Sequence, residues 1–545
     1  MSDSTKFLVI EDKKQRRKDW YTLILSGVLL GASFPPSPLP FLAFLAFVPY
    51  FSVIEKRNGL GSINRATYLF ALVFNIITLY WVGSWTEEAD PFLKISGVVL
   101  VFFNPLLFLI PSTLYHIARK YTGRKYAIWF LPLFYAGYEY LYTITEFRFP
   151  WLVIGNGQAY FNTYIQIADI IGAHGITILV LLTNIFLYFA LKQFYNGGKY
   201  LRQVVYASLI FAVPLLYGVA KGYPVKTLPG FRAGIVQPDM NPWNKWETGN
   251  LEKQLEDYLS LSDSCIADGA DLVVWPETAL PVYLLSGRYE NIVEKIHAFV
   301  DSTGVPVLTG MPHANIYRNR ESAPWDAKPI KGGDEAYTSY NSILLFEPGT
   351  NEVERYGKIM LVPYGEKVPY VESLPWLGDL LKWEVGISSW NTGRDTVVFE
   401  TKINEQNINI GGVICIESIY PDFTAQFVGK GANVLAVVTN DSWYGYSSGP
   451  FQHKAISILR AIENRRYLIR CANGGVSCII SPSGEIEEET ELFTRTYLTG
   501  MVYPNNELTF YSRFPLLIPG LSTVTIVFFA ILGLLKKIRK ILYKK

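Results

Sequence analysis

Long apolar stretches fill most of the first 220 residues of the chain and return once near its end. A helix needs about 20 mostly apolar residues to cross a bilayer. Eight stretches approach this length, at residues 20–34, 39–54, 66–85, 93–115, 126–145, 168–191, 203–220 and 515–535. The pattern therefore predicts eight transmembrane helices. The first is short and follows "KKQRRK", as in a signal peptide, but no cleavage site leads into a polar region, so we interpret it as an uncleaved anchor.

The hydrophobic pattern changes in the middle of the chain. Between residues 231 and 503, short β-rich runs such as "FRAGIVQP", "ADLVVWPE" and "ANVLAVVTND" alternate with amphipathic helical stretches. Strands separated by helices are typical of an α/β sheet. We therefore predict three parts: a membrane domain with seven helices at 1–224, an α/β catalytic domain at 225–513, and a last transmembrane helix with a basic tail at 514–545.

Positive charge is distributed very unevenly around the predicted helices. The N-terminal tail, segments 55–65, 119–125 and 192–202, and the C-terminal tail together hold 22 Lys and Arg residues, whereas the alternate short loops hold only Arg148. Cytoplasmic loops are enriched in Lys and Arg. We therefore expect both termini in the cytoplasm and the α/β domain on the outer face of the membrane.

Composition excludes several function classes. A net charge of +2 argues against a nucleic-acid-binding protein, which normally carries a strong basic patch. The five histidines are scattered and form no HExxH motif, and no GxxxxGK[ST] phosphate loop is present. The sequence therefore predicts neither a metal site nor a cofactor, and no nucleic-acid partner.

Three chemically active residues each follow a predicted strand. Glu277 follows "LVVWP", Lys358 follows "EVERYG" and Cys415 follows "IGGVI". Ligands of α/β sheets bind beyond the carboxyl ends of strands. There Glu277 can take the thiol proton of Cys415, and Lys358 can stabilise an oxyanion together with the backbone N–H of Ile416. The trio predicts acyl transfer through a thioester.

Each of these residues also has a plain structural explanation. A free cysteine is most often a small buried hydrophobe, a lysine is most often solvated, and a glutamate after Trp-Pro often belongs to a turn. It is their joint occurrence at strand ends that favours chemistry. The "GYSSG" motif around Ser447 fits a hydrolase elbow less well, because the preceding strand ends too early. Cys471 and Cys478 flank a predicted turn, and a bridge between them is left open.

The blocks around the trio resemble a known family. "VVWPETALP", "YGKIMLVPYGEKVP" and "GGVICIES" are similar to the three catalytic blocks of the nitrilase, or carbon-nitrogen hydrolase, superfamily. Eight transmembrane helices around one outer domain resemble the bacterial apolipoprotein N-acyltransferases, a membrane-anchored branch of it. "LVPYGE", which follows the lysine, also points to this branch. The resemblance implies an α-helical membrane bundle joined to an α/β nitrilase-like αββα sandwich.

The resemblance also implies roles for single residues. Glu277 is the expected general base, Lys358 the oxyanion lysine and Cys415 the nucleophile. Supporting carboxylates are expected at Glu366 and Glu417, and substrate-binding residues at Trp246, Asn341 and Trp443. Many relatives have Tyr after the nucleophile where this chain has Ile416, so only the backbone N–H can act there.

The activity implied is an apolipoprotein N-acyltransferase of the bacterial inner membrane. A fatty acyl chain would pass from a phospholipid to Cys415, and then to the α-amino group of the N-terminal diacylglyceryl-cysteine of a lipoprotein, in a ping-pong sequence. The catalytic domain is expected on the periplasmic face. Trp376 and Trp383, on an apolar segment between the lysine and cysteine blocks, would either pack on the core or form a lid at the membrane interface.

Two other function classes fit part of the pattern. A membrane-tethered amidase or nitrilase-type hydrolase would use the same trio on a small polar substrate, and would not need apolar flanks. A transporter with an outer accessory domain would carry charged or broken helices at mid-bilayer, and the predicted helices contain few such residues.

Overall fold

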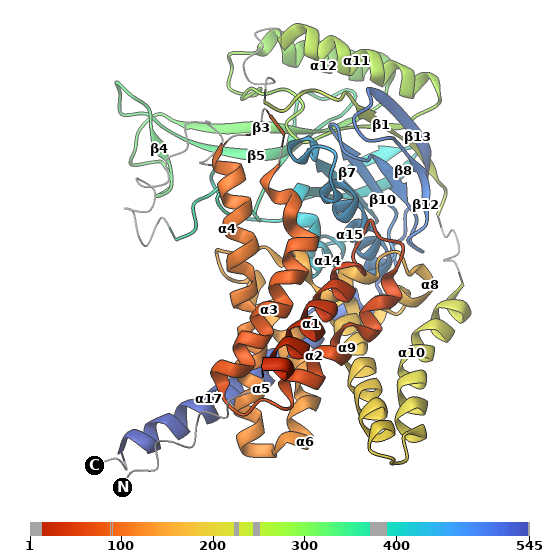
Figure 1. Cartoon of the computed structure of the whole chain (residues 1–545). Helices are drawn as coiled ribbons and strands as arrows, with labels where there is room; N and C mark the ends of the chain where they lie inside the picture. The colour runs from red at the N-terminus through yellow and green to blue at the C-terminus, as the bar shows by residue number, and fades with distance from the viewer. Residues whose placement is uncertain are drawn as a thin grey trace.

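A computed structural model of the chain describes residues 13–84, 86–87, 89, 91–222, 228–243, 251–370 and 390–542. A helical part, built from both ends of the sequence, lies against an α/β part formed by the middle of the chain (Figure 1).

Every predicted transmembrane stretch contains a helix. The helices of this part are α1 (Lys13–Gly31), α2 (Ala43–Ile54), α3 (Leu60–Leu79), α4 (Pro91–Leu107), α5 (Leu109–Thr122), α6 (Arg124–Ala127), α7 (Leu131–Thr143), α8 (Asn162–Ile165), α9 (Ala168–Tyr195), α10 (Leu201–Lys221) and α17 (Leu517–Leu542). Among the described residues, five helical spans are long and apolar enough to cross a membrane, and Pro40–Ile54 is a shorter apolar one. The helical membrane character is confirmed, while the number eight stays a prediction.

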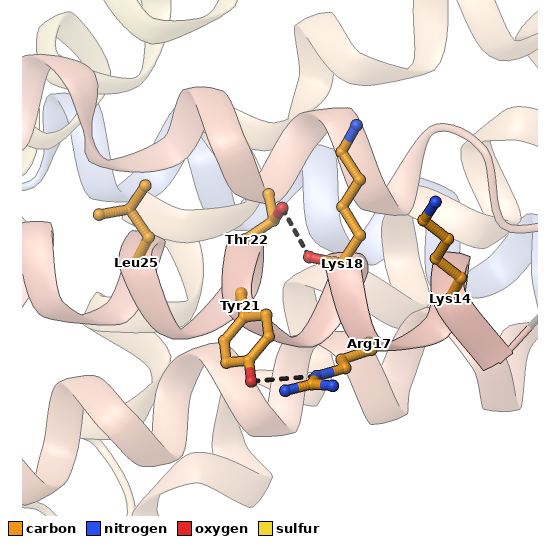
Figure 2. Close-up of a pocket in the computed structure, with 6 residues that line it drawn as sticks. All are labelled: Lys14, Arg17, Lys18, Tyr21, Thr22 and Leu25. Carbon is orange, nitrogen blue, oxygen red and sulfur yellow. Dashed lines mark hydrogen bonds between the residues drawn. The ribbon is translucent and has the colours of Figure 1, made fainter.

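The basic residues of the helical part meet at one end of it. Arg57, after α2, pairs with Asp19 of α1, and the guanidinium of Arg119 in α5 donates to the carbonyl of Arg57 over 2.6 Å. Helix α6 and the end of α17 lie on the side away from the sheets (Figure 1). Figure 2 shows Lys14, Arg17 and Lys18 on the first turns of α1, lining a pocket with Tyr21, Thr22 and Leu25.

Two stacked sheets form the α/β part. The first has the order β13-β1-β2-β3-β5-β4, with β6 also paired to β5, and the second has the order β12-β11-β10-β9-β8-β7. The first sheet contains β1 (Phe231–Gln237), β2 (Leu272–Trp275), β3 (Val307–Tyr317), β4 (Lys328–Pro329), β5 (Ala336–Phe346), β6 (Glu354–Gly357) and β13 (Thr496–Val502). The second contains β7 (Val398–Ile403), β8 (Gln406–Ile414), β9 (Val434–Thr439), β10 (Leu468–Ala472), β11 (Cys478–Ile480) and β12 (Ile486–Glu489).

Helices cover the outer face of each sheet, which gives the expected αββα sandwich. Helices α11 (Leu251–Ala267) and α12 (Glu290–Thr303) cover the first sheet (Figure 1). Helices α14 (Pro421–Gly429) and α15 (Ser448–Asn464) cover the second on the side of the membrane helices, and α16 (Phe510–Arg513) leads into α17. Along β2, Val274 joins the core between the sheets, whereas Val273 and Trp275 pack under α11 and α12. Both faces of the central strands are therefore buried, as the continuous apolar run "LVVW" predicts.

Helix α15 is a buried layer between the two parts of the molecule. Most of its residues are buried, and it contacts both β10 and the membrane helix α9. The catalytic domain thus has one face sealed by the helical part.

Candidate active site

The three predicted reactive residues lie where the sequence places them, each just after a strand. Glu277 follows β2, Lys358 follows β6, and Cys415 begins a 3-10 turn, Cys415–Ile419, that follows β8. Strands β2 and β6 belong to the first sheet and β8 to the second. The stacking of the sheets therefore brings together residues that are far apart in the sequence.

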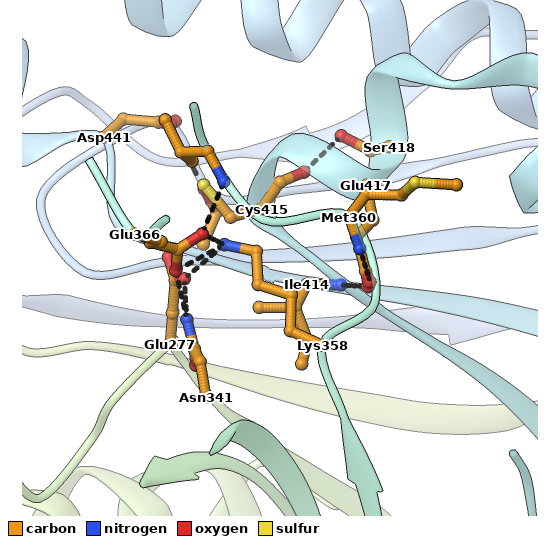
Figure 3. A network of polar contacts seen from close by, with 12 residues as sticks. Glu277, Asn341, Lys358, Met360, Glu366, Ile414, Cys415, Glu417, Ser418 and Asp441 are labelled. Atoms are coloured by element: carbon orange, nitrogen blue, oxygen red, sulfur yellow. Dashed lines mark hydrogen bonds and ion pairs between the residues drawn. The ribbon is translucent and has the colours of Figure 1, made fainter. Parts of the chain in front are cut away.

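The ammonium group of Lys358 is shared by two carboxylates (Figure 3). Its Nζ lies 3.3 Å from Oε1 of Glu277 and 2.9 Å from Oε1 of Glu366. Lys358 is only 1% exposed, and both glutamates are buried. Burial alone would lower the pKa of Lys358, but the charges of Glu366 and Glu277 outweigh it and raise that pKa well above its ordinary value. The lysine is therefore a fixed positive charge.

Asn341 of β5 holds the two carboxylates in place. Its amide nitrogen donates to Oε1 of Glu277 over 2.7 Å and to Oε1 of Glu366 over 3.0 Å. The backbone N–H of Val362 donates to the other oxygen of Glu366 over 2.9 Å. The amide nitrogen of Asn341 thus serves the carboxylates, and its expected role in substrate binding stays a prediction.

Two glycines allow the backbone segments of the site to approach closely. A Cβ on Gly310 of β3 would lie 2.6 Å from the Cα of Glu277, and one on Gly393 would lie 1.9 Å from the carbonyl oxygen of Gly357. Real Cβ contacts are never this short. Only glycine at these positions lets the segments carrying Glu277 and Lys358 lie where they do.

The backbone of Cys415 is in the left-handed region, with a φ of 50°. A non-glycine residue there costs about 1–3 kcal/mol, and such strain clusters at active sites. The side chain is partly exposed, unlike the other three cysteines, which are buried; all four thiols are free. Burial of the thiol group and the nearby charge of Glu277 raise the pKa of Cys415, against the opposing charge of Lys358. The thiol is therefore protonated at neutral pH and needs a base to react.

Glu417 connects the lysine segment to the cysteine strand. One of its oxygens accepts hydrogen bonds from the hydroxyl of Tyr356 and the N–H of Ile359, each over 2.7 Å, and from the N–H of Met360 over 3.1 Å. The other accepts from the N–H of Ile414 over 2.9 Å. Glu417 is 0% exposed, and burial raises its pKa to about 7 even though these hydrogen bonds lower it. Its place is structural, at the base of the site.

A buried polar cluster behind Cys415 is absent from the sequence predictions. His453 of α15 lies 2.8 Å from Oδ1 of Asp441 through Nδ1, and its Nε2 lies 2.9 Å from the hydroxyl of Ser418 and 3.1 Å from the carbonyl oxygen of Cys415. Arg470 of β10 pairs with the other oxygen of Asp441. The available signals were the histidine in the first turn of a predicted helix and the aspartate after "VVTN".

The remaining predicted residues are at the edges of the site or outside the described residues. The ring of Trp443 packs edge-on against that of Trp243 at 4.9 Å. Ile416 is buried beside the nucleophile. Trp246, Trp376 and Trp383 lie outside the described residues. The side chain of Ser447 accepts the N–H of Gly449 as the N-cap of α15, which is a structural role.

Comparison with known proteins agrees with this geometry. Residues 232–505 match the carbon-nitrogen hydrolase family, and residues 26–186 match the apolipoprotein N-acyltransferase N-terminal domain. The apolipoprotein N-acyltransferase of Chlorobaculum tepidum is 34% identical over 532 residues, which cover 96% of this chain and 97% of that protein. The chain belongs to the apolipoprotein N-acyltransferase family. A second family member, from Geobacter metallireducens, is 29% identical over 91% of this chain and 92% of that protein.

Solved structures include one similar in the α/β part. An amidase from Nesterenkonia sp. is 14% identical, covering 51% of this chain and 91% of the amidase with a TM-score of 0.35. Family membership confirms the resemblance seen in the three sequence blocks, and with it the combination of a helical membrane part and a nitrilase-like domain. The domain boundaries at residues 224 and 513 stay predictions.

Proposed function

We propose that this chain transfers a fatty acyl group from a phospholipid to the free α-amino group of an N-terminal, lipid-modified cysteine on a lipoprotein, through a thioester on Cys415. The observation that carries the proposal is the buried Lys358 ammonium between Glu277 and Glu366, beside a strained cysteine. The names of the relatives supply the acceptor class.

The first half-reaction loads the enzyme. Glu277 takes the proton of the Cys415 thiol as the sulfur attacks the ester carbonyl of the phospholipid. Lys358 and the backbone N–H of Ile416 stabilise the oxyanion of the tetrahedral intermediate. The C–O ester bond then breaks, Glu277 returns the proton to the leaving alkoxide, and the lyso-phospholipid departs.

The second half-reaction transfers the acyl group. The neutral amine attacks the thioester carbonyl and gives a proton to Glu277, the C–S bond breaks, and the thiol is regenerated from that proton. Donor and acceptor use the same thioester in turn, which makes the kinetics ping-pong. Glu366 and Asn341 keep Glu277 and Lys358 in register throughout, without contacting the reacting atoms.

Aromatic side chains next to the site favour a lipid substrate over a small polar one. The ring of Phe147, which is 36% exposed, lies 6.1 Å from that of Phe103 on α4. It also lies 6.3 Å from Tyr364 and 5.2 Å from Tyr370, in the segment that carries Glu366. An apolar surface therefore runs from a membrane helix to the catalytic carboxylates. We place this face of the molecule on the periplasmic side, with both termini in the cytoplasm, from the distribution of Lys and Arg.

Intact-mass measurement tests the proposal. Protein incubated with a bacterial phospholipid mixture in detergent should gain one acyl group that hydroxylamine removes, and Cys415→Ala should gain none. A diacylated lipopeptide with a free N-terminus should then take the group as an amide, while its N-acetylated version takes none. An adduct that persists in Cys415→Ala would refute the nucleophile. Free fatty acid as the main product, with lipopeptide present, would favour the membrane-tethered amidase or nitrilase-type hydrolase instead.

A further inference from the structure

The first turn of α15 is tied to the membrane helices. The side-chain carbonyl of Gln452 accepts the indole N–H of Trp81, at the end of α3, over 3.1 Å, and that of Trp151 over 2.7 Å. Its amide nitrogen donates to the carbonyl of Thr78 over 3.2 Å. All of these groups are buried. Residue 453, next along the helix, is therefore held at a defined distance from the membrane part.

His453 fills the space between this tie and the nucleophile. Its ring lies 5.3 Å from that of Trp151, and the residue is 3% exposed. Nδ1 faces Asp441, and Nε2 faces both the hydroxyl of Ser418 and the carbonyl oxygen of Cys415. The charged groups packed around the ring are Asp441, before α15, and Arg470, on β10.

Charge assigns the protons in this cluster. Burial would raise the pKa of Asp441, but Arg470 and His453 lower it to about 2, so the carboxylate is ionised and Nδ1 must carry a hydrogen. Burial, together with Arg470, lowers the pKa of His453, so the ring is neutral at pH 7 and its Nε2 is an acceptor.

The hydroxyl of Ser418 is then the only hydrogen among these three contacts. It stands 2.9 Å from Nε2 and 2.8 Å from the carbonyl oxygen of Cys415, and a hydroxyl there can bridge two acceptors that otherwise repel at 3.1 Å. The imidazole thus orients the group that fixes the carbonyl of the nucleophile. A left-handed Cys415 persists only if its surroundings over-determine it.

We propose that His453 is a positioning residue for the acyl-transfer reaction: through Ser418 it fixes the strained backbone of Cys415, and so aims the thiol at the ester carbonyl. The inference rests on Cys415 being the nucleophile. His453 contacts neither the sulfur nor the substrate, so it acts through geometry alone. A displacement of about 1 Å in a reacting group can cost on the order of 10²-fold in rate.

Two amide substitutions separate the faces of the ring. The side-chain amide of Gln stands as many bonds from Cα as Nε2 does, whereas that of Asn stands as many bonds away as Nδ1. Both remove the ring and its contact with Trp151. We expect His453→Asn to slow single-turnover thioester formation by about 10²-fold with little change in the phospholipid concentration at half-saturation. His453→Gln should stay within about tenfold of wild type, because its amide still reaches Ser418.

Matched variants cover other causes of a loss. His297 is also buried and packs on an aromatic ring, that of Phe346 at 5.1 Å, so His297→Asn should react like wild type. Ser418→Ala removes only a hydroxyl and should lose rate as His453→Asn does. The rate of Cys415 alkylation by iodoacetamide, measured by mass, reports thiol placement without lipid; the other cysteines are buried.

The outcomes are distinct. Wild-type rates in His453→Asn or in Ser418→Ala would overturn the positioning role. A His453→Gln variant as slow as His453→Asn, with an unchanged Tm, would also overturn it, since ring packing would then explain the loss. If wild-type protein itself forms no thioester on Cys415, it is the proposed function that fails, and the alkylation rates still decide whether His453 places the thiol.

Discussion

Lys358→Met tests the charge balance at the centre of the site. The substitution keeps much of the apolar stem but removes the ammonium that lies 3.3 Å from Glu277 and 2.9 Å from Glu366. Two buried carboxylates then share only the amide of Asn341. Removing one partner of a buried ion pair costs about 3–5 kcal/mol. At roughly 2–4 °C per kcal/mol for a domain of similar size, we expect Tm in detergent to fall by the order of 10 °C.

The double variant Lys358→Met/Glu366→Gln separates stability from catalysis. It removes one charge of each sign, so we expect Tm to recover a large part of the loss. Thioester formation should stay at least about 10²–10³-fold below wild type, the usual cost of a lost oxyanion donor, because Glu366→Gln does not replace the ammonium. A single variant with unchanged Tm would refute the ion-pair geometry, and a double variant that forms thioester at the wild-type rate would refute the oxyanion role of Lys358.

Three further predictions follow from the site and the topology. Glu417→Ala leaves four buried donors without an acceptor and should lower Tm more than Glu417→Gln, which keeps one oxygen; unsatisfied donors cost about 1–3 kcal/mol each, and equal Tm values would contradict this. Gly310→Ala should slow thioester formation, whereas Gly520→Ala, with open space around it, should not. A membrane-impermeant thiol label should reach a cysteine at Ser302 in intact cells and not one at Ser62; the reverse would invert the proposed orientation.

The reactive trio could be predicted because each member follows a short, strongly apolar strand. Runs such as "LVVW" and "NIGGVI" mark strand ends within a residue or two, and the α/β rule then places the next polar side chain at the site. The model confirms the strands and the contacts of Lys358 with Glu277 and Glu366. The catalytic roles remain predictions, because no contact in a resting structure shows a proton or an acyl group moving.

Helix ends were predicted less well, for a physical reason. Helix α1 begins at Lys13, seven residues before the predicted stretch, because the charged turn "KKQRRK" is helical although it is polar. The stretch at 93–115 is divided between α4 and α5, with the break at Phe108. Hydropathy follows what a bilayer favours, whereas helix bounds depend on backbone hydrogen bonds and on residues such as Pro105 that interrupt them.

The cluster behind Cys415 could not be predicted from pattern, because its members come from four separate elements. Asp441 follows β9, His453 lies on α15, Ser418 on the 3-10 turn and Arg470 on β10. None of them repeats a motif with a fixed spacing, and a lone histidine in a helix is usually a packing residue. Only the stacking of β8, β9 and β10 under α15 brings them within hydrogen-bonding distance.

The same stacking makes the membrane part a component of the active site. Trp81 ends α3, is 1% exposed, and contacts the ring of Tyr444 at 4.7 Å as well as Gln452. A Cβ on Gly449 would lie 2.7 Å from its indole, so α15 has no side chain where the tryptophan enters. A shift of α3 therefore cannot leave α15 in place, and α15 carries the histidine that faces the nucleophile. Because packed interiors transmit displacement rather than absorb it, the helices that meet the lipid and the turn that holds the thiol form one mechanical unit.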